Sequence, residues 1–218
     1  TVPPCTLEIT DAETFARDWT VIDVNSNVSA NTWAYNDGNA MYTQDKSNAA
    51  DDWLIAPAVT LEAGKAYKVS AYVKHSSTFG SDKQKIELKI GTAPTVEGLT
   101  TRLVYDESFQ SRLFVEKSGT FSPAESGVFY VGLRCYSESY NGDLYFQKIV
   151  IEEAPVYPAQ ITDLSIVAGE RGAMSATLSW TWPSSDHLGG ALSNLSGAKI
   201  YRGTDLVATL DTANVGGK

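Results

Sequence analysis

Apolar and polar residues alternate with a period of two over most of this chain, and this alternation constrains the fold more than any other feature. In AYKVSAYVK, residues 66–74, every second side chain is apolar. The same pattern recurs in KQKIELKIG, GVFYVGLRCYS and DLYFQKIVIEE. In the last of these runs, the predicted inward face carries Tyr145, Gln147, Ile149 and Ile151. Such alternation is typical of half-buried antiparallel strands.

Turn signals separate the strands, and the sequence contains no long helical pattern. NDG at 36–38, EAG at 62–64 and YNGD at 140–143 are of the composition that closes hairpins. DAETFARDW, residues 11–19, predicts one short helical turn with Asp11 as its cap. Many short strands joined by such turns favour an all-β protein built as a β-sandwich.

The proline-containing segment EEAPVYPAQ, residues 152–160, predicts a boundary between two domains, because proline cannot donate to a strand ladder. The predicted division is a β-sandwich over 1–153, a linker over 154–160 and a second β domain over 161–218. The second region contains four strand patterns, too few for a complete sandwich of about seven. It is therefore expected to be partial. Trp53 and Trp180, within or beside alternating runs, are expected to be buried.

Composition excludes several partners. The chain has 17 Lys and Arg against 26 Asp and Glu, a formal charge of -9. An acidic chain repels phosphate backbones and anionic membranes, so no nucleic-acid partner is expected. No apolar run approaches the roughly 20 residues of a spanning helix. No signal-peptide pattern opens the chain, so a mature or trimmed form is expected.

The chain has two cysteines, Cys5 and Cys135, and neither belongs to a CxxC pair. A zinc or thioredoxin-like motif is therefore not expected. The two side chains form either one disulfide, in an oxidising compartment, or two buried thiols that pack as small hydrophobes.

Three blocks of sequence, WTVIDVNSNVSANTW at 19–33, DDWLIAPAVTLEAGKAYKVSAYV at 51–73 and GDLYFQKIVIEE at 142–153, resemble the cleaved-adhesin or choice-of-anchor J family. The resemblance covers roughly residues 5–153. It implies a MAM-like, galactose-binding-like jelly roll, as in gingipain adhesin domains and surface proteins of gut Bacteroidetes. The later region resembles the first half of a fibronectin type III domain, an immunoglobulin-like sandwich, with Trp180 and Tyr201 at its core positions.

The same resemblance implies a structural calcium site, because calcium is bound by carboxylate, amide and carbonyl oxygens. The candidate ligands are Glu8, Asp23, Asn25, Asp51, Asp52 and Gln147. Two departures weaken the site: Gln147 replaces an acidic residue of the family, and NSNVS replaces its D-x-D-G loop. Adjacent Asp51 and Asp52 are expected to point to opposite faces of a strand, so only one of them faces the site. Turn-forming residues and a solvated pair of carboxylates are the alternative.

Aromatic side chains beside amides predict a sugar-binding surface, because rings stack on pyranose faces. Trp33 and Trp53 are expected to be structural. The candidate ligand-binding residues are Tyr35, Tyr42, Tyr140 and Asn141. The expected partner is a carbohydrate or a host or bacterial surface protein.

Catalytic motifs are not recognisable in the sequence. His75 and His187 are the two histidines, and no G-x-S-x-G, H-E-x-x-H or Walker loop occurs. The prediction is a non-catalytic, extracytoplasmic, adhesin-like binding module, either secreted or attached to the cell surface. A structural spacer that presents another domain is the main alternative. A carboxylate-dependent hydrolase is a third.

Overall fold

The structure is a computed structural model that describes residues 1–25, 31–76, 82–187, 189–192 and 194–218. The chain divides into two compact units, Thr1–Ala154 and Pro155–Lys218. Strands are the main regular structure of both units, so the all-β expectation is confirmed for the described residues. Within them, no helix is long and apolar enough to cross a membrane.

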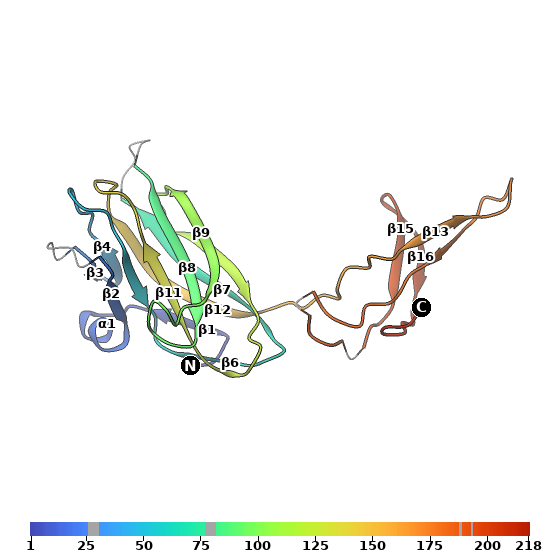
Figure 1. Ribbon diagram of the computed structural model, residues 1–218, viewed down its shortest axis with the longest axis horizontal. Helices are drawn as coiled ribbons and strands as arrows, with labels where there is room; N and C mark the ends of the chain where they lie inside the picture. The colour runs from blue at the N-terminus through green and yellow to red at the C-terminus, as the bar shows by residue number, and fades with distance from the viewer. Residues whose placement is uncertain (26–30, 77–81, 188, 193) are drawn as a thin grey trace. The chain divides into compact units, whose positions relative to one another are not determined.

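The first unit is a jelly-roll β-sandwich of two antiparallel six-stranded sheets (Figure 1). The first sheet has the order β10-β7-β12-β4-β3, with β1 paired to β12. Its strands are β1 (Cys5–Glu8), β3 (Trp33–Asn36), β4 (Asn39–Tyr42), β7 (Ala66–His75), β10 (Val115–Phe121) and β12 (Leu144–Ala154). The second sheet has the order β2-β5-β11-β8-β9, with β6 paired to β11. Its strands are β2 (Thr20–Asp23), β5 (Asp52–Ile55), β6 (Val59–Leu61), β8 (Gln84–Gly91), β9 (Thr101–Phe109) and β11 (Gly127–Cys135).

The core lies between the two sheets and follows the predicted alternation. In β7 the inward side chains include Val69, Ala71 and Val73, all fully buried. They face the inward side chains of the second sheet, such as Ile86 and Leu88 on β8. Since each strand buries alternate residues, the remaining positions of the second sheet point outward and are free to build a surface.

Strand β12 contains a β-bulge, and its inward face therefore differs from the predicted one. The pairing of β12 with β7 shifts register between Phe146 and Lys148, so Gln147 is the extra residue. Leu144 and Phe146 are buried before the bulge, and Ile149 is buried after it. The prediction that Tyr145 and Gln147 share the inward face of Ile149 is therefore wrong, because the bulge changes the phase of the alternation.

Among the described residues, one short helix is present, and it begins after the cap that the sequence predicts. α1 spans Ala12–Asp18, and the Asp11 side chain accepts a hydrogen bond from the backbone N–H of Thr14 at 2.7 Å. This bond satisfies one of the unpaired donors of the first turn. Phe15 is the buried side chain of the helix, and it joins the core between the sheets.

The two cysteines are free thiols, so the alternative of a disulfide is not realised. Cys5 lies on β1, which pairs with β12 in the first sheet, whereas Cys135 lies on β11 in the second sheet. The thiol of Cys135 is fully buried and donates to Oε1 of Gln84 at 3.3 Å. Burial raises the pKa of Cys135 to about 12, which keeps it an uncharged packing residue.

The described residues of the second unit contain two β-hairpins, which belong to separate two-stranded sheets. They are β13 (Ser165–Ala168) with β14 (Ala176–Ser179), and β15 (Ala198–Arg202) with β16 (Asp205–Leu210). Trp182 is buried, but Trp180 is only half-buried and lies beyond the end of β14. The expectation of burial is confirmed for Trp53, and Trp180 agrees with it in part, because its indole nitrogen is enclosed while the side chain stays half-buried. The likeness of this unit to a fibronectin type III domain stays a prediction.

The loop between β8 and β9 covers part of the outer face of the second sheet. Leu99, at the end of this loop, packs with Trp53 and Ile55 in a small cluster separate from the main core. The loop is held against Gly91 at its start, where the N–H of Thr92 donates to the carbonyl of Gly98 at 3.2 Å. A Cβ atom on Gly91 would overlap this same carbonyl oxygen.

We predict that Gly91→Ala destabilises the first unit by roughly 1–3 kcal/mol, the usual cost of overpacking. The matched control is Gly127→Ala in β11, where a new Cβ would meet only Phe129 Cε2 at 3.9 Å. Chemical denaturation followed by tryptophan fluorescence measures both variants. Equal stability of the two variants would contradict the packing of this loop.

Candidate functional site: the outer face of the second sheet

Four outward side chains form a row across the second sheet. Cross-strand pairing places Tyr105 of β9 opposite Glu87 of β8, Glu87 opposite Arg134 of β11, and Arg134 opposite Trp53 of β5. We call this set the outer row. Because the neighbouring positions on each strand face the core, the register alone brings these four side chains together.

Trp53 forms the closed end of the outer row. Its side chain is 1% exposed, although it points away from the main core, because Leu99 packs over it. The Arg134 guanidinium lies 5.7 Å from the Trp53 ring centroid, and the Lys89 ammonium lies 5.5 Å from it. Trp53 therefore packs against cationic side chains, and its ring is not accessible to a ligand.

An ion-pair network holds the middle of the outer row. The Glu87 carboxylate lies 3.0 Å from Arg102, 3.5 Å from Arg134 and 3.6 Å from Lys89. Arg134 also donates two hydrogen bonds to the Asp51 carboxylate, at 2.7 and 2.8 Å. These bonds to Asp51 raise the pKa of Arg134 above its usual value. A forked pair of this kind fixes the plane of the guanidinium.

Two tyrosines form the open end of the site. The rings of Tyr105 and Tyr136 stack at 6.0 Å with an interplanar angle of 22°. Arg134 lies 5.0 Å from the Tyr136 ring and Arg102 lies 4.7 Å from the Tyr105 ring, so a cation flanks each member of the pair. Tyr105 is 51% exposed, and its hydroxyl donates to Glu107 at 2.8 Å.

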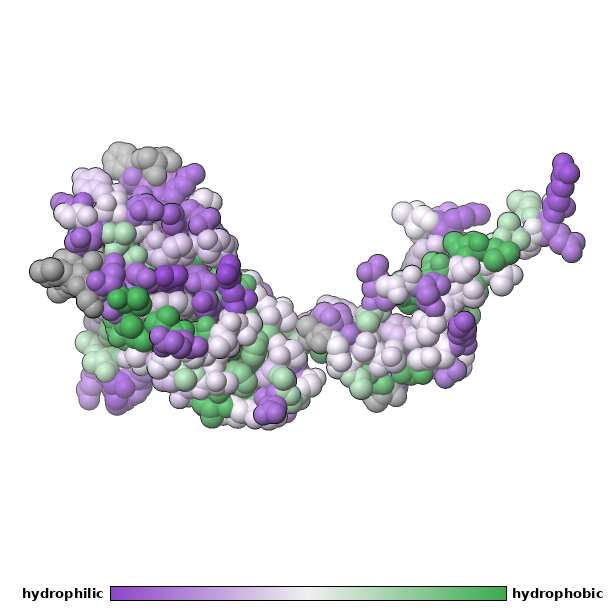
Figure 2. Space-filling model, in the orientation of Figure 1, coloured by the Kyte–Doolittle hydropathy of each residue, from purple (hydrophilic) through white to green (hydrophobic). Residues whose placement is uncertain are grey.

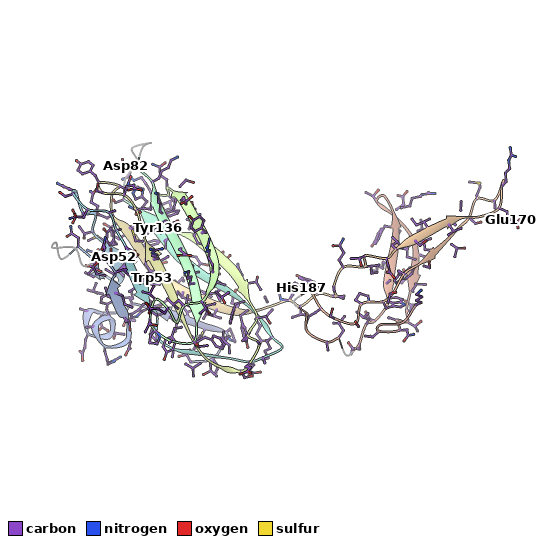
Figure 3. The ribbon with its side chains drawn as sticks, viewed as in Figure 1. Asp52, Trp53, Asp82, Tyr136, Glu170 and His187 are labelled. Carbon is purple, nitrogen blue, oxygen red and sulfur yellow. The ribbon has the colours of Figure 1, made fainter. Side chains whose placement is uncertain are left out.

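The figures show the surroundings of these residues. Trp53 and Tyr136 are seen over the strands of the second sheet in Figure 3. On the face shown in Figure 2, a band of hydrophilic residues crosses the first unit beside a group of hydrophobic ones. Aromatic rings, guanidinium groups and carboxylates within one surface are the usual components of a recognition site.

The predicted ligand-binding residues do not gather at one place. Tyr42 is 2% exposed and packs edge-on against Trp33 at 6.1 Å, so its prediction as a ligand contact is wrong. Burial raises its pKa. Tyr42 turns inward because β4 pairs with β12 at Leu144, a core position. Tyr35 is half-buried and packs against the core.

Tyr140 and Asn141 lie together in the loop before β12. Tyr140 is 64% exposed, with a positive φ of 63°, and remains open to a ligand. Asn141 instead builds the loop. Its carbonyl meets His75 Nε2 at 2.5 Å and accepts from Gln84 Nε2 at 3.1 Å, and its amide donates to the carbonyl of Glu138.

The predicted calcium ligands divide between the two sheets. Glu8 is exposed on β1, 3.9 Å from Lys148, and Gln147 occupies the bulge of β12, both in the first sheet. Asp23 of β2 and Asp52 of β5 are directly opposed in the second sheet. Among the described residues, no three His, Cys, Asp or Glu side chains form a group that could hold a metal ion.

The other two predicted ligands have different partners. Asn25 donates to the carbonyl of Ala49 at 2.7 Å. Asp51 points outward and pairs with Arg134, whereas Asp52 is fully buried, so the expectation that the two aspartates face opposite ways agrees with their placement. The NSNVS loop lies mostly outside the described residues, which omit 26–30.

Asp52 is a buried carboxylate with little compensation. Its Oδ2 accepts the backbone N–H of Asp51 at 3.1 Å, and its Oδ1 has no hydrogen-bond partner among the described residues. Desolvation raises the pKa of Asp52 to about 6, and the nearby carboxylates of Asp23 and Asp51 add to this shift, whereas the Thr32 side chain and the Asp51 N–H oppose it.

Sequence reasoning missed most of the outer row. Glu87, Tyr105 and Arg134 are outward positions of strands in the second sheet, and none of them was predicted from the sequence as a candidate site residue. The available signal was chemical: these positions carry tyrosine and arginine, which bind ligands more often than serine or lysine do. The pairing that unites them was not readable from the sequence, because it depends on strand order.

Comparisons with known proteins agree with this fold. No protein-family model matches the sequence, and no curated protein is significantly similar to it. The K3 cleaved adhesin domain of Lys-gingipain from Porphyromonas gingivalis is similar in structure, at 11% identity, with 66% of this chain and 97% of that chain covered and a TM-score of 0.51.

Two further solved structures are similar at lower scores. The K1 cleaved adhesin domain of the same gingipain is 14% identical, covers 69% of this chain and 99% of its own, and has a TM-score of 0.48. A CBM4 module is 15% identical, covers 69% and 95%, and has a TM-score of 0.46. At these identities the likeness concerns the fold. The protein thus contains a jelly-roll β-sandwich with the fold of a cleaved adhesin domain.

We predict that Asp52 makes stability fall as pH rises. Its folded pKa, about 6, lies above the ordinary value of 3.8. The folded state therefore binds this proton more tightly, and the stabilisation is complete below 3.8 and lost as pH rises through 6. The difference amounts to about 3 kcal/mol at 1.36 kcal/mol per unit.

Asp52→Asn should remove this pH dependence and stabilise the protein at pH 7, because an amide is neutral and still accepts from the Asp51 N–H. Urea denaturation between pH 4 and 7 measures the effect. Asp37→Asn, in an exposed turn, is the control and should leave the pH profile unchanged. An unaltered profile in Asp52→Asn would show that the dependence arises elsewhere.

Proposed function

We propose that the first unit is a non-catalytic, extracytoplasmic binding module that binds carbohydrate on the outer face of its second sheet. The observation that carries this proposal is the stacked pair of exposed Tyr105 and half-buried Tyr136 within a network of arginines and carboxylates. The likeness in fold to a cleaved adhesin domain supports the extracytoplasmic location.

The chemistry of this face suits a polyhydroxylated ligand. A pyranose ring presents C–H groups to an aromatic ring and hydroxyl groups at its rim. Tyr105 and Tyr136 supply the ring surface, and Arg102, Arg134 and Asp51 supply donors and acceptors beside it. The ion pairs hold these polar groups in position before the ligand arrives, which lowers the entropic cost of binding.

The main alternative ligand is a surface protein, since tyrosine, tryptophan and arginine are also enriched in protein interfaces. The outer row combines aromatic rings with paired polar groups. This combination favours a sugar, because a sugar uses both its C–H groups and its hydroxyl groups in binding. Binding of protein but of no polysaccharide would support the alternative and contradict this proposal.

We predict that Tyr105→Ala and Tyr136→Ala each weaken binding to a polysaccharide by about tenfold or more, since truncating a central contact costs about 1.4 kcal/mol or more. Affinity gel electrophoresis against neutral and acidic polysaccharides identifies the ligand, and calorimetry measures the loss. Tyr140→Ala is the matched control, because this tyrosine is more exposed but lies on a different loop. Loss of binding in Tyr140→Ala alone would move the site to that loop.

A structural calcium ion also stays a prediction. Asp23 and Asp52 are opposed across β2 and β5, and the free Oδ1 of Asp52 fits a cation ligand, but Glu8 and Gln147 lie in the other sheet. An ion that binds only the native state stabilises it by about 2.7 kcal/mol at a hundredfold excess over its Kd. The melting temperature should therefore rise with millimolar calcium and fall with chelator.

The matched variants for this test are Asp23→Ala and Glu8→Ala. Asp23→Ala should abolish the response to calcium, whereas the placement of Glu8 in the first sheet means that Glu8→Ala should leave it intact. Magnesium should act more weakly, because it demands a tighter octahedral shell. A melting curve that is identical in calcium and in chelator would exclude the ion.

A further inference from the structure

Glu87 occupies an unusual place for a carboxylate. It lies in the middle of an outward sheet face, yet its side chain is only 6% exposed. Cationic side chains from three strands surround it: Lys89 from its own strand β8, Arg102 from β9 and Arg134 from β11. A charge buried to this extent is stable only when it is paired, and here the pairing is threefold.

The charges of the surrounding surface cancel. The cations that contact the outer row or its margin are Lys85, Lys89, Arg102 and Arg134, and the carboxylates are Asp51, Glu87, Glu107 and Glu138. Each of the four cations has a carboxylate within 3.6 Å. The surface is therefore locally neutral, although the whole chain carries a formal charge of -9.

We infer that this face selects uncharged polysaccharides, and that Glu87 is the residue that determines this selectivity. The inference rests on the proposed carbohydrate-binding function. Arginine forks bind carboxylate and sulfate groups strongly when they are free. Here Asp51 fills the fork of Arg134, and Glu87 engages Arg102, Arg134 and Lys89.

A neutral sugar meets no electrostatic barrier on this surface. Its hydroxyl groups hydrogen-bond to the paired charges without breaking the pairs, and its rings contact Tyr105 and Tyr136. A uronate or a sulfated sugar would have to displace Glu87 or Asp51 from the arginines, or else lie beside these carboxylates uncompensated. Binding to the neutral chain should accordingly depend little on salt, because no net charge is exchanged.

The test compares neutral polysaccharides, namely xylan, mannan and a β-glucan, with polygalacturonate and a sulfated polysaccharide, each at low and at high salt. The wild-type protein should bind at least one neutral chain, with a Kd that changes less than about twofold between the two salt concentrations. It should bind neither anionic chain measurably.

Glu87→Gln removes the carboxylate that pairs with Arg102 and Lys89, while Arg134 keeps its pair with Asp51, so the surface gains one net positive charge. This variant should gain binding to polygalacturonate, about tenfold stronger at low salt than at high salt. Glu138→Gln is the matched control: it removes the same charge from the exposed partner of Lys85 at the margin, and should gain nothing. Asp51→Asn, which frees the fork of Arg134, is the second variant and should reproduce the gain if Glu87→Gln does not fold.

The outcomes separate this inference from the proposed function. If the wild-type protein binds no polysaccharide, the carbohydrate function itself fails. If the wild-type protein prefers an anionic chain, the function stands and the inferred selectivity is overturned. If only neutral chains bind but neither Glu87→Gln nor Asp51→Asn gains affinity for polygalacturonate, the role assigned to Glu87 is overturned.

Discussion

The pairing of strand β11 with β5, β6 and β8 is the constraint on which the rest of the first unit depends. Val131, Leu133 and Cys135 of this strand are buried in the core, and Arg134 points to the opposite face between Glu87 and Trp53. One register therefore fixes both the core and the outer row. A slip of one residue would exchange the two faces and place Arg134 in the core.

The second sheet has two buried carboxylates, Glu87 and Asp52, and the free-energy cost of removing each from water is offset to a different extent. Glu87 faces outward and is surrounded by three cations, which keep its charge compensated. Asp52 faces inward, beside Cys135 in the register, with one carboxylate oxygen lacking a partner among the described residues. Desolvation thus raises its pKa. Cations thus compensate the carboxylate of Glu87, whereas burial favours the protonated form of Asp52.

The sequence predicted local structure well because alternation and capping are local. The core faces of β7 and β8, the cap of α1 and the opposite directions of Asp51 and Asp52 all follow from neighbouring residues. The bulge at Gln147 was not predictable, since it depends on how β12 meets β7.

The site was harder to predict for the same reason. Tyr42 has polar neighbours in sequence but lies in the core, whereas Tyr105 and Arg134 are distant in sequence and fall into one row only because β8 lies between their strands. Strand order is a property of the whole sandwich. Residue type can identify single candidate site residues, but it cannot show which of them lie on the same face of a sheet.

Under the proposed function, the outer row holds a ligand by means of aromatic rings and fixed polar groups. Glu87 and Asp51 are both paired with cationic side chains, which hold the two carboxylates in place. His75 is buried in the first unit against the carbonyl of Asn141, and His187 belongs to the second unit, where it contacts Tyr157. This face offers aromatic ring surface and hydrogen-bonding groups that ion pairs hold in position. Because such groups lose little conformational freedom on binding, more of the contact energy remains as affinity.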